Sequence, residues 1–376
     1  MQIKFFDPIV KVVTSELTPV CWCRIVILTS LLIVLGAAAL AFIVDPHYRY
    51  RMPVFYDTVY YELYATAPRL LRDRTYDTLF IGSSMTRNIY LSDIDRALGG
   101  KSMKLAASGA TVTDLKKLFD VAREAKGESL KRVIFSLDIY SINKTGSLCD
   151  EFSYLYRKDF KEEYRYLFSR QTFSSMYYLL KSKYRPRKKR LHQHDPDKMF
   201  STQSPGMKFG LDQVMEDAVG NAAIHHTQTP ANPAVFNENL KKQLLPIVAE
   251  NPQISFTFYL APYHIYTYCQ SEQFKEADGL IRQRTQAVKE LLKYPNVKLY
   301  DYQADRELVC NDDFYSDVQH FSSDAARLLL KKLASGERRI RTAAEAEANE
   351  KELRDLIREK MPVYYKHLKE FKERRK

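Results

Sequence analysis

The strongest constraint on the fold is a regular alternation of strand-like and helix-like segments that begins at residue 76. Short apolar runs are followed by longer stretches whose apolar residues recur at helical spacing, as at Leu115, Leu118 and Ala122. Because parallel strands need a crossover between them, this alternation predicts an α/β fold with a three-layer arrangement, a parallel sheet with helices on both faces. The expected strands are 76–81, 104–107, 132–140, 254–260 and 297–302, and the expected helices are 92–98 and 113–125 (capped by Ser92 and Thr113), 238–249, 272–293 and 323–333.

An uncharged apolar segment, Ile25 to Val44, precedes this alternation. It is long enough to cross a bilayer as one helix. A cleaved signal peptide usually has a shorter apolar core followed by small residues, and the small residues of 37–41 leave that alternative open. The length of the segment favours an uncleaved transmembrane anchor.

Charges on either side of this segment indicate its orientation. Basic residues precede it at Lys4, Lys11 and Arg24, and basic residues follow it at Arg49 and Arg51. Positive charge favours the cytoplasmic side of a span. We therefore expect a single-pass protein of the cell membrane, with a cytoplasmic N-terminus and an extracytoplasmic soluble domain.

The chain divides into five parts on these patterns. We expect a cytoplasmic lead (1–20), a transmembrane anchor (21–44), a juxtamembrane stalk (45–75), a catalytic domain (76–335) with a helical insertion (150–235), and a charged helical tail (336–376) broken by Pro362. The insertion could cap the site. Its basic cluster, 181–190, is either a solvated helix end or an anion-binding segment. The tail could pack on the domain, lie on a membrane surface, bind a partner as a helix or be mobile.

Charge and composition limit the partners. The 376 residues are 45% hydrophobic, enough for one large domain with extensions, and carry a net charge of +12. A basic surface favours nucleic acid, anionic lipid or anionic cell-envelope polymers. The expected extracytoplasmic orientation excludes nucleic acid. The expected partners are the lipid bilayer and an anionic cell-surface glycan or polymer.

Three residues form a candidate catalytic set. Ser84 follows a strand-like run, whereas Asp317 and His320 lie three residues apart near the end of the domain. A serine nucleophile needs a nearby base, and the base needs a group that orients it. Backbone N–H groups of Ser84 and Gly109 could stabilise an oxyanion. Each residue also has a structural alternative as a turn, cap or packing residue. This chemistry calls for no cofactor, and the five cysteines show no metal-ligand spacing.

Cys269 and Cys310 each follow an expected strand. If those strands are neighbours in a parallel sheet, both thiols emerge at the same end and could form a disulfide. Two separate thiols are the equal alternative, because sequence does not fix connectivity.

Four short blocks of the chain resemble the SGNH/GDSL-type hydrolase superfamily, in its membrane-anchored bacterial branch, a layout distantly like that of the teichoic-acid D-alanyl transfer protein. These blocks are Gly82-Ser83-Ser84-Met85-Thr86, Ala107-Ser108-Gly109, Ser136-Leu137-Asp138 and Asp317-Val318-Gln319-His320. The resemblance implies a flavodoxin-like sheet of the SGNH hydrolase type. It also implies Ser84 as nucleophile, His320 as base, Asp317 as its orienting group and Gly109 as an oxyanion donor.

One position departs from that superfamily. Asp138 stands where an asparagine usually completes the oxyanion hole, and a carboxylate there would repel the developing charge. Weak hydrolysis, another donor such as Asn143, a retuned transferase or a binding protein without activity would each account for the change. Arg87 and Tyr140, which neighbour these blocks, are candidate substrate-binding residues.

The resulting expectation is a serine esterase or O-acyltransferase that acts on acyl groups of a cell-surface glycan or lipid-linked polymer. The alternative is a non-catalytic component of polysaccharide modification, which binds polymer or a membrane acyltransferase.

Overall fold

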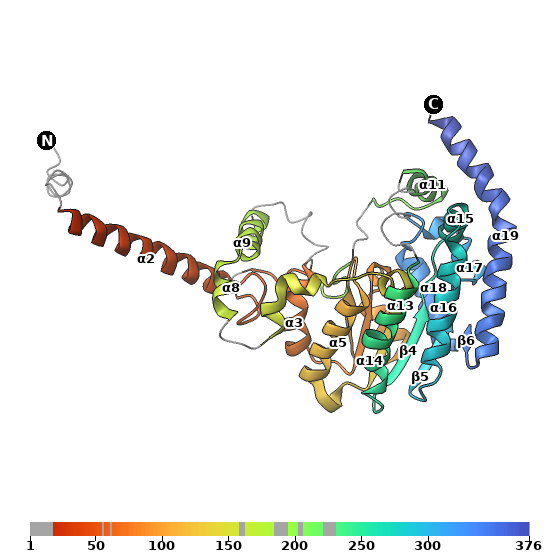
Figure 1. The fold of residues 1–376 in the computed structure, drawn as a ribbon, viewed down its shortest axis with the longest axis horizontal. Coiled ribbons are helices and arrows are strands. Elements are labelled where there is room, and N and C mark those ends of the chain that lie inside the picture. Colours follow the sequence, from red (N-terminus) through yellow and green to blue (C-terminus); the bar gives the residue numbers. More distant parts are fainter. Residues whose placement is uncertain are drawn as a thin grey trace.

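A six-stranded sheet forms the centre of the molecule in the computed structural model, which describes residues 18–54, 56–60, 62–157, 162–183, 195–201, 206–220 and 231–375 (Figure 1). The strand order is β2-β1-β3-β4-β5-β6, with β1 to β5 parallel and β6 antiparallel to β5. The strands are β1 (Thr78–Gly82), β2 (Ser102–Ala106), β3 (Arg132–Leu137), β4 (Ser255–Leu260), β5 (Val297–Asp301) and β6 (Arg339–Ile340). The predicted mostly parallel α/β architecture is thus confirmed.

Alternate side chains of each strand enter two separate cores. Leu79 and Ile81 of β1 lie in one core, whereas Phe80 between them lies in the other. The first core lies under α3 (Leu63–Asp73), α5 (Val112–Lys126), α13 (Pro233–Asn239), a π-helical turn (Leu240–Leu244) and α14 (Leu245–Ala249). The second lies under α4 (Leu91–Leu98), α11 (Leu211–Gly220), α15 (Ile265–Gln273), α17 (Arg306–Val309), α18 (Ser323–Ser335) and α19 (Ala343–Arg374). Helix α16 (Ala277–Leu291) contributes to both cores.

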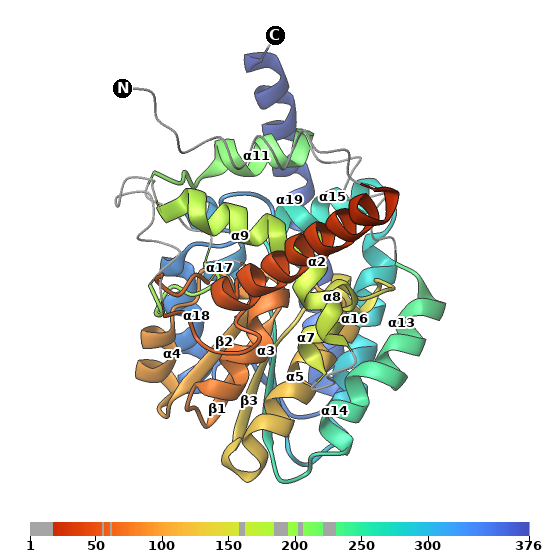
Figure 2. The same ribbon diagram turned by 90° about the vertical axis from the view of Figure 1, so that its left-hand side faces the viewer.

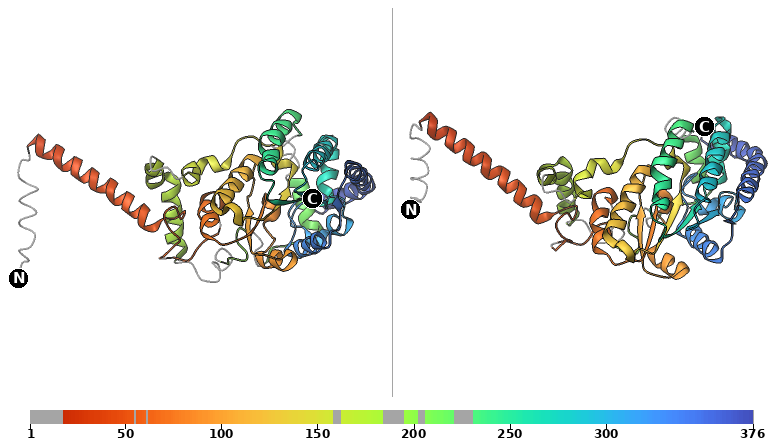
Figure 3. Two further views of the ribbon diagram at one scale, coloured as in Figure 1. Left: turned by 90° about the horizontal axis from the view of Figure 1, so that it is seen from below. Right: turned by 60° about the horizontal axis from the view of Figure 1, so that its bottom comes forward.

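The apolar N-terminal segment forms the helix α2 (Pro19–Val44), which is long and apolar enough to cross a membrane. Thr18 caps its start, and Asp45 ends it in a left-handed conformation. The helix projects from the body of the molecule and points away from α19 at the opposite end (Figure 1, Figure 3). Its side chains are exposed on almost all sides, as a span in lipid requires.

Two segments outside the sheet, 45–75 and the insertion 150–235, differ from the sequence expectations. Residues 45–75 are not only a stalk, because α3 packs on α5 and belongs to the first core. The insertion divides between two places: α8 (Glu163–Phe168) and α9 (Arg170–Lys183) pack beside α2, whereas α11 packs against α15 and α19 (Figure 2). Most of the basic cluster 181–190 lies outside the described residues.

Two helices also differ from their predicted limits. The expected helix 272–293 is two helices, α15 and α16, because Lys275 between them has a left-handed backbone with φ of 61°. Helix α19 continues through Pro362, which was expected to break it. The expected caps Ser92 and Thr113 are also wrong: Tyr90 and Thr111 occupy those positions. Short turns complete the chain: η1 (Ser84–Thr86), η2 (Gly127–Ser129), α6 (Ile139–Ile142), η3 (Leu148–Phe152), α7 (Ser153–Tyr156) and η7 (Asp312–Phe314).

Candidate active site

Ser84 lies immediately beyond the carboxyl end of β1, where it begins the single turn η1. The Ser83 hydroxyl accepts a hydrogen bond from the Met85 N–H and so starts that turn. Glycine is required at 82, because a Cβ atom there would lie 2.5 Å from the Ser136 Cβ and 2.6 Å from the Thr86 Cγ2. The strand end therefore packs closely on β3. β2 and β3 pair with opposite edges of β1, so the strand order reverses there. Ser84 therefore lies at the position in the sheet where open α/β sheets place their binding sites.

His320 lies on a loop between η7 and α18. A β-bridge between Tyr315 and Phe321 closes this loop at its base. The backbone carbonyl of Val318, inside the loop, accepts hydrogen bonds from the His264 N–H (3.1 Å) and from the Thr267 hydroxyl. The start of α15 thus fixes the loop that carries the imidazole.

The fold brings Ser84, His320 and Asp317 into one hydrogen-bonded chain. The Ser84 Oγ lies 2.7 Å from the His320 Nε2, and the His320 Nδ1 lies 2.7 Å from the Asp317 Oδ2. The Asp317 Oδ1 accepts hydrogen bonds from the backbone N–H groups of Gln319 and His320, both at 2.7 Å. These distances match the relation of nucleophile, base and orienting carboxylate that nucleophilic catalysis requires.

Hydrogen bonds stabilise the ionised form of the Asp317 carboxyl. Burial alone would raise the pKa of the Asp317 carboxyl, but the His320 ring and the two backbone N–H groups bring that pKa below its ordinary value of 3.8. Burial lowers the pKa of the nearby Arg87 guanidinium, and the Asp317 charge opposes that effect. The carboxylate is therefore ionised at neutral pH, as an imidazole-orienting group must be.

Two side chains that the sequence analysis did not single out hold the segment after Ser84. The Asn88 side chain donates to the Phe321 carbonyl at 2.7 Å, which ties this segment to the His320 loop. The fully buried Lys104 Nζ donates to the carbonyls of Arg87 (3.2 Å) and Ile89 (2.6 Å). The only local sequence signal for the Lys104 contact is a lysine inside a strand-like run. The Asn88 contact has no local sequence signal.

Gly109 and Ser84 are the candidate oxyanion donors. Within the described part of the chain, neither backbone N–H donates a hydrogen bond. Gly109 has φ of 71°, a conformation that suits glycine. The side chain and the backbone of its neighbour Ser108 each accept a hydrogen bond. The Ser108 hydroxyl accepts from the Arg87 Nε at 2.6 Å, and the Ser108 carbonyl accepts from the Tyr64 hydroxyl at 2.8 Å. Arg87, predicted to bind substrate, thus makes a contact that positions the Gly109 loop.

Asp138 and Asn143, the candidate third donors, are both committed to structural contacts. The Asp138 carboxylate caps α6 by accepting from the Tyr140 N–H (3.0 Å), and it also accepts from the Tyr263 hydroxyl (2.7 Å). The Asn143 side chain donates to Gln283 at 2.7 Å and accepts from the Asn232 N–H at 3.0 Å. Within the described residues, the hydrogen bonds of both side chains go to the junction of α6 with its neighbours and not to Ser84, Asp317 or His320.

The remaining sequence candidates are Tyr140, Cys269 and Cys310. Tyr140, predicted to bind substrate, lies partly buried with its ring 5.8 Å from that of Tyr263. Cys269 and Cys310 are free thiols, so the predicted disulfide is not formed. Cys269 lies inside α15 and not in a loop at the strand end, and the alternative of two separate thiols is the one observed. No group of three or more metal-ligating side chains occurs among the described residues.

No protein-family model matches this chain, and no curated protein is significantly similar to it.

Proposed function

We propose that this protein is a membrane-anchored serine esterase or O-acyltransferase of the SGNH type, with α2 as its anchor and its α/β domain outside the cytoplasm. The observation that carries the proposal is the continuous hydrogen-bonded chain from the Ser84 hydroxyl through His320 to Asp317. The order of the first five strands, 2-1-3-4-5, is that of flavodoxin-like sheets, and it supports this assignment.

In the proposed first step, the Ser84 Oγ attacks the carbonyl carbon of an acyl ester while the His320 Nε2 takes its proton. The N–H groups of Ser84 and Gly109 stabilise the oxyanion, and Asp317 stabilises the imidazolium. Collapse of the tetrahedral intermediate breaks the ester bond, and His320 returns the proton to the leaving alcohol. In the second step, water or a sugar hydroxyl attacks the seryl ester and releases Ser84. Attack by water is hydrolysis, and attack by a sugar hydroxyl is acyl transfer.

The net charge of +12 supports an anionic cell-surface glycan or lipid-linked polymer as the acyl donor or acceptor. Arg87 adds a positive charge close to the reacting groups, through its contact with the Ser108 hydroxyl. An anionic polymer would thus be attracted to the surface and to the site.

A second candidate is a non-catalytic component that binds polymer or a membrane acyltransferase. Asp138 favours this alternative, since the residue that usually completes an oxyanion hole is here a carboxylate bonded to Tyr263. With two donors in place of three, an oxyanion would be less well stabilised, because each donor contributes separately.

Covalent labelling of the purified full chain with a fluorophosphonate separates the two candidates. We expect labelling at Ser84, its loss in Ser84→Ala, and a fall in ester turnover of at least about a thousandfold in that variant. Ser83→Ala is the matched control, because Ser83 only caps the turn η1, and it should remain labelled. Unlabelled wild-type protein, or equal labelling of Ser84→Ala, would contradict the enzyme proposal and favour the binding component.

A further inference from the structure

The junction between α2 and the domain is rigid. The Asp45 carboxylate accepts hydrogen bonds from the backbone N–H groups of Arg49 (2.8 Å), Tyr50 (2.9 Å) and Arg51 (3.0 Å), and from the Tyr166 hydroxyl (2.6 Å). These bonds fold the chain into a tight turn where α2 ends. The Arg51 guanidinium closes the turn by donating to the last carbonyl groups of α2. These hydrogen bonds tie the first residues of the domain to the end of the helix.

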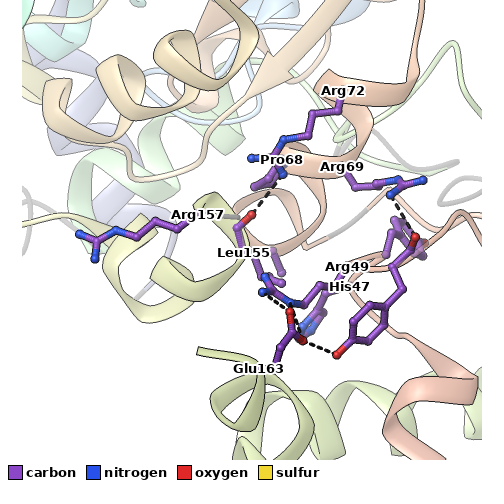
Figure 4. Close-up of a pocket in the computed structure, with 11 residues that line it drawn as sticks. His47, Arg49, Pro68, Arg69, Arg72, Leu155, Arg157 and Glu163 are labelled. Carbon is purple, nitrogen blue, oxygen red and sulfur yellow. Dashed lines mark hydrogen bonds and ion pairs between the residues drawn. The ribbon is translucent and has the colours of Figure 1, made fainter. Parts of the chain in front are cut away.

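A cavity of about 310 Å³ opens beside this turn (Figure 4). Its lining combines the turn after α2, one side of α3 and the segment around α7 and α8. The charged residues of the lining are four arginines and one glutamate: Arg49, Arg69, Arg72, Arg157 and Glu163. His47, also in the lining, is neutral at pH 7, because burial lowers its pKa to about 4. The cavity is therefore strongly positive.

The arginines of the lining differ in how many of their N–H groups are bound to neighbouring residues. Arg49 is fully engaged, since it donates to both oxygens of Glu163 and to the Tyr154 carbonyl. Arg69 donates to Asp73 (2.6 Å) and to the Tyr50 carbonyl (3.1 Å), two of its five N–H groups.

Arg72 and Arg157 differ in their access to the cavity. Arg72 donates to the carbonyls of Leu155 (3.3 Å) and Tyr156 (3.0 Å), which uses two of its five N–H groups, and Glu124 and Asp73 offset part of its charge.

Arg157 lies 3.9 Å from Glu162, and its exposed guanidinium extends away from the other lining residues (Figure 4). Arg69 and Arg72 therefore have N–H groups left for an anion in the cavity, whereas Arg157 lies at its rim.

The surface beside the cavity has the composition of a membrane interface. Tyr164 and Phe168 on α8, and Tyr177 and Leu180 on α9, are exposed by 61%, 45%, 66% and 49%. Both helices pack beside α2. Tyrosine and other aromatic side chains gather at the level of lipid headgroups, and large exposed apolar groups elsewhere on a soluble surface are unusual.

We propose that this cavity binds the phosphate headgroup of an anionic phospholipid in the leaflet where α2 leaves the bilayer. Position, charge and surroundings agree: the cavity adjoins the end of the span, has more arginines than carboxylates in its lining and lies beside an aromatic surface. Arginine forks suit phosphate oxygens, and basic pockets at this level bind anionic headgroups. The bound lipid would hold the domain at a fixed orientation above the membrane. The inference rests on the proposed anchoring by α2 and not on the proposed chemistry of Ser84.

The test uses the full chain purified in a zwitterionic detergent. Native mass spectrometry and the thermal unfolding midpoint would compare short-chain phosphatidylglycerol, short-chain phosphatidylcholine and free glycerol phosphate. We expect phosphatidylglycerol to bind and to raise the midpoint, and the other two to have little effect. Equal binding of phosphatidylcholine would overturn the proposed charge recognition. Equal binding of glycerol phosphate would overturn the assignment to a lipid and leave a soluble phosphate ligand in its place.

Single variants locate the site. Arg72→Gln and Arg69→Gln should each weaken phosphatidylglycerol binding about fivefold, since a basic residue near a headgroup contributes about 1 kcal/mol. Arg69 is partly exposed and pairs with Asp73, so Arg69→Gln keeps the test valid if Arg72→Gln is unstable. Arg282→Gln, exposed on α16, is the matched control and should bind normally. Unchanged binding in both cavity variants, or an equal loss in Arg282→Gln, would contradict the proposed site. Ser84 labelling of these variants should persist, which separates this test from that of the enzyme proposal.

Discussion

At the scale of single residues, Asp317 has two separate roles in the candidate site. One carboxylate oxygen accepts the backbone N–H groups of Gln319 and His320 and so shapes the loop. The other oxygen accepts from the His320 ring and sets which ring nitrogen carries the proton. The Nε2 atom is thereby left free to take the Ser84 proton.

Two substitutions of Asp317 should separate these roles. Asp317→Asn can retain the oxygen that accepts the backbone groups, but its amide would face the His320 Nδ1 and favour the wrong tautomer. We expect turnover to fall by about 10⁴ with little change in stability. Asp317→Ala also leaves two backbone N–H groups without a partner, so the free energy of unfolding should fall by about 1–3 kcal/mol. Ester kinetics and denaturant unfolding would measure both effects. Equal stability of the two variants would contradict a role of Asp317 in shaping the loop.

At the scale of structural elements, side-chain hydrogen bonds connect the segment between β1 and α4 to other parts of the fold. Lys104 reaches it from β2, and Asn88 within it reaches the loop of His320. Burial lowers the pKa of the Lys104 ammonium from 10.5 to about 7. A neutral amine can still donate to two carbonyls, as Lys104 does.

This low pKa predicts a dependence of stability on pH. Between about pH 10.5 and pH 7 the unfolded chain binds a proton at Lys104 that the folded chain does not bind, so this residue destabilises the fold progressively as pH falls. Below about pH 7 both states are protonated and the effect is constant. Lys104→Met lacks this titration. We therefore expect the wild-type protein to gain stability relative to Lys104→Met when pH rises from about 7 to about 10. A difference in unfolding free energy that does not vary with pH would show that Lys104 is charged in the fold.

The elements that the sequence predicted well are those with a strong local signal. Five strands lie close to their expected positions, because buried parallel strands are continuous apolar runs bounded by turns. The strand β6 could not be predicted, since Arg339–Ile340 is a strand only through its pairing with β5. The break between α15 and α16 depends on the left-handed backbone of Lys275, a residue that rarely marks such a position.

The candidate site was predictable to a similar extent. Ser84 and the pair Asp317 and His320 carry local signals, a strand end and a short spacing. The roles of Asn88 and Lys104 have no such signal, because their partners are fixed only by tertiary structure. The same holds for the capping role of Asp138, whose position the resemblance to the SGNH/GDSL-type superfamily assigns to the oxyanion hole.

At the scale of the whole molecule, α2 and α19 lie at opposite ends of the domain (Figure 1). Packing on the domain was one of the alternatives for the charged tail that contains α19, and this helix does pack there and completes the second core. Its inward-facing side chains are almost fully buried: Leu353, Leu356, Ile357, Tyr364 and Phe371. It covers α15, whose first turn fixes the His320 loop through Val318. The end of the chain therefore supports the candidate catalytic base from outside.

One buried residue of α19 tests this role. Leu356 is 1% exposed, whereas Tyr365, on the same helix, is 46% exposed. Leu356→Ala should lower the free energy of unfolding by about 2–5 kcal/mol, because it leaves a cavity in the second core. Tyr365→Ala should change it by about 0.5 kcal/mol or less. Urea unfolding of the detergent-solubilised full chain would compare them. Since a domain is stable by only about 5–15 kcal/mol, the first change would remove a large part of the total. If the two variants were equally stable, α19 would not belong to the cooperative fold, and the support that it gives to the His320 loop would be excluded.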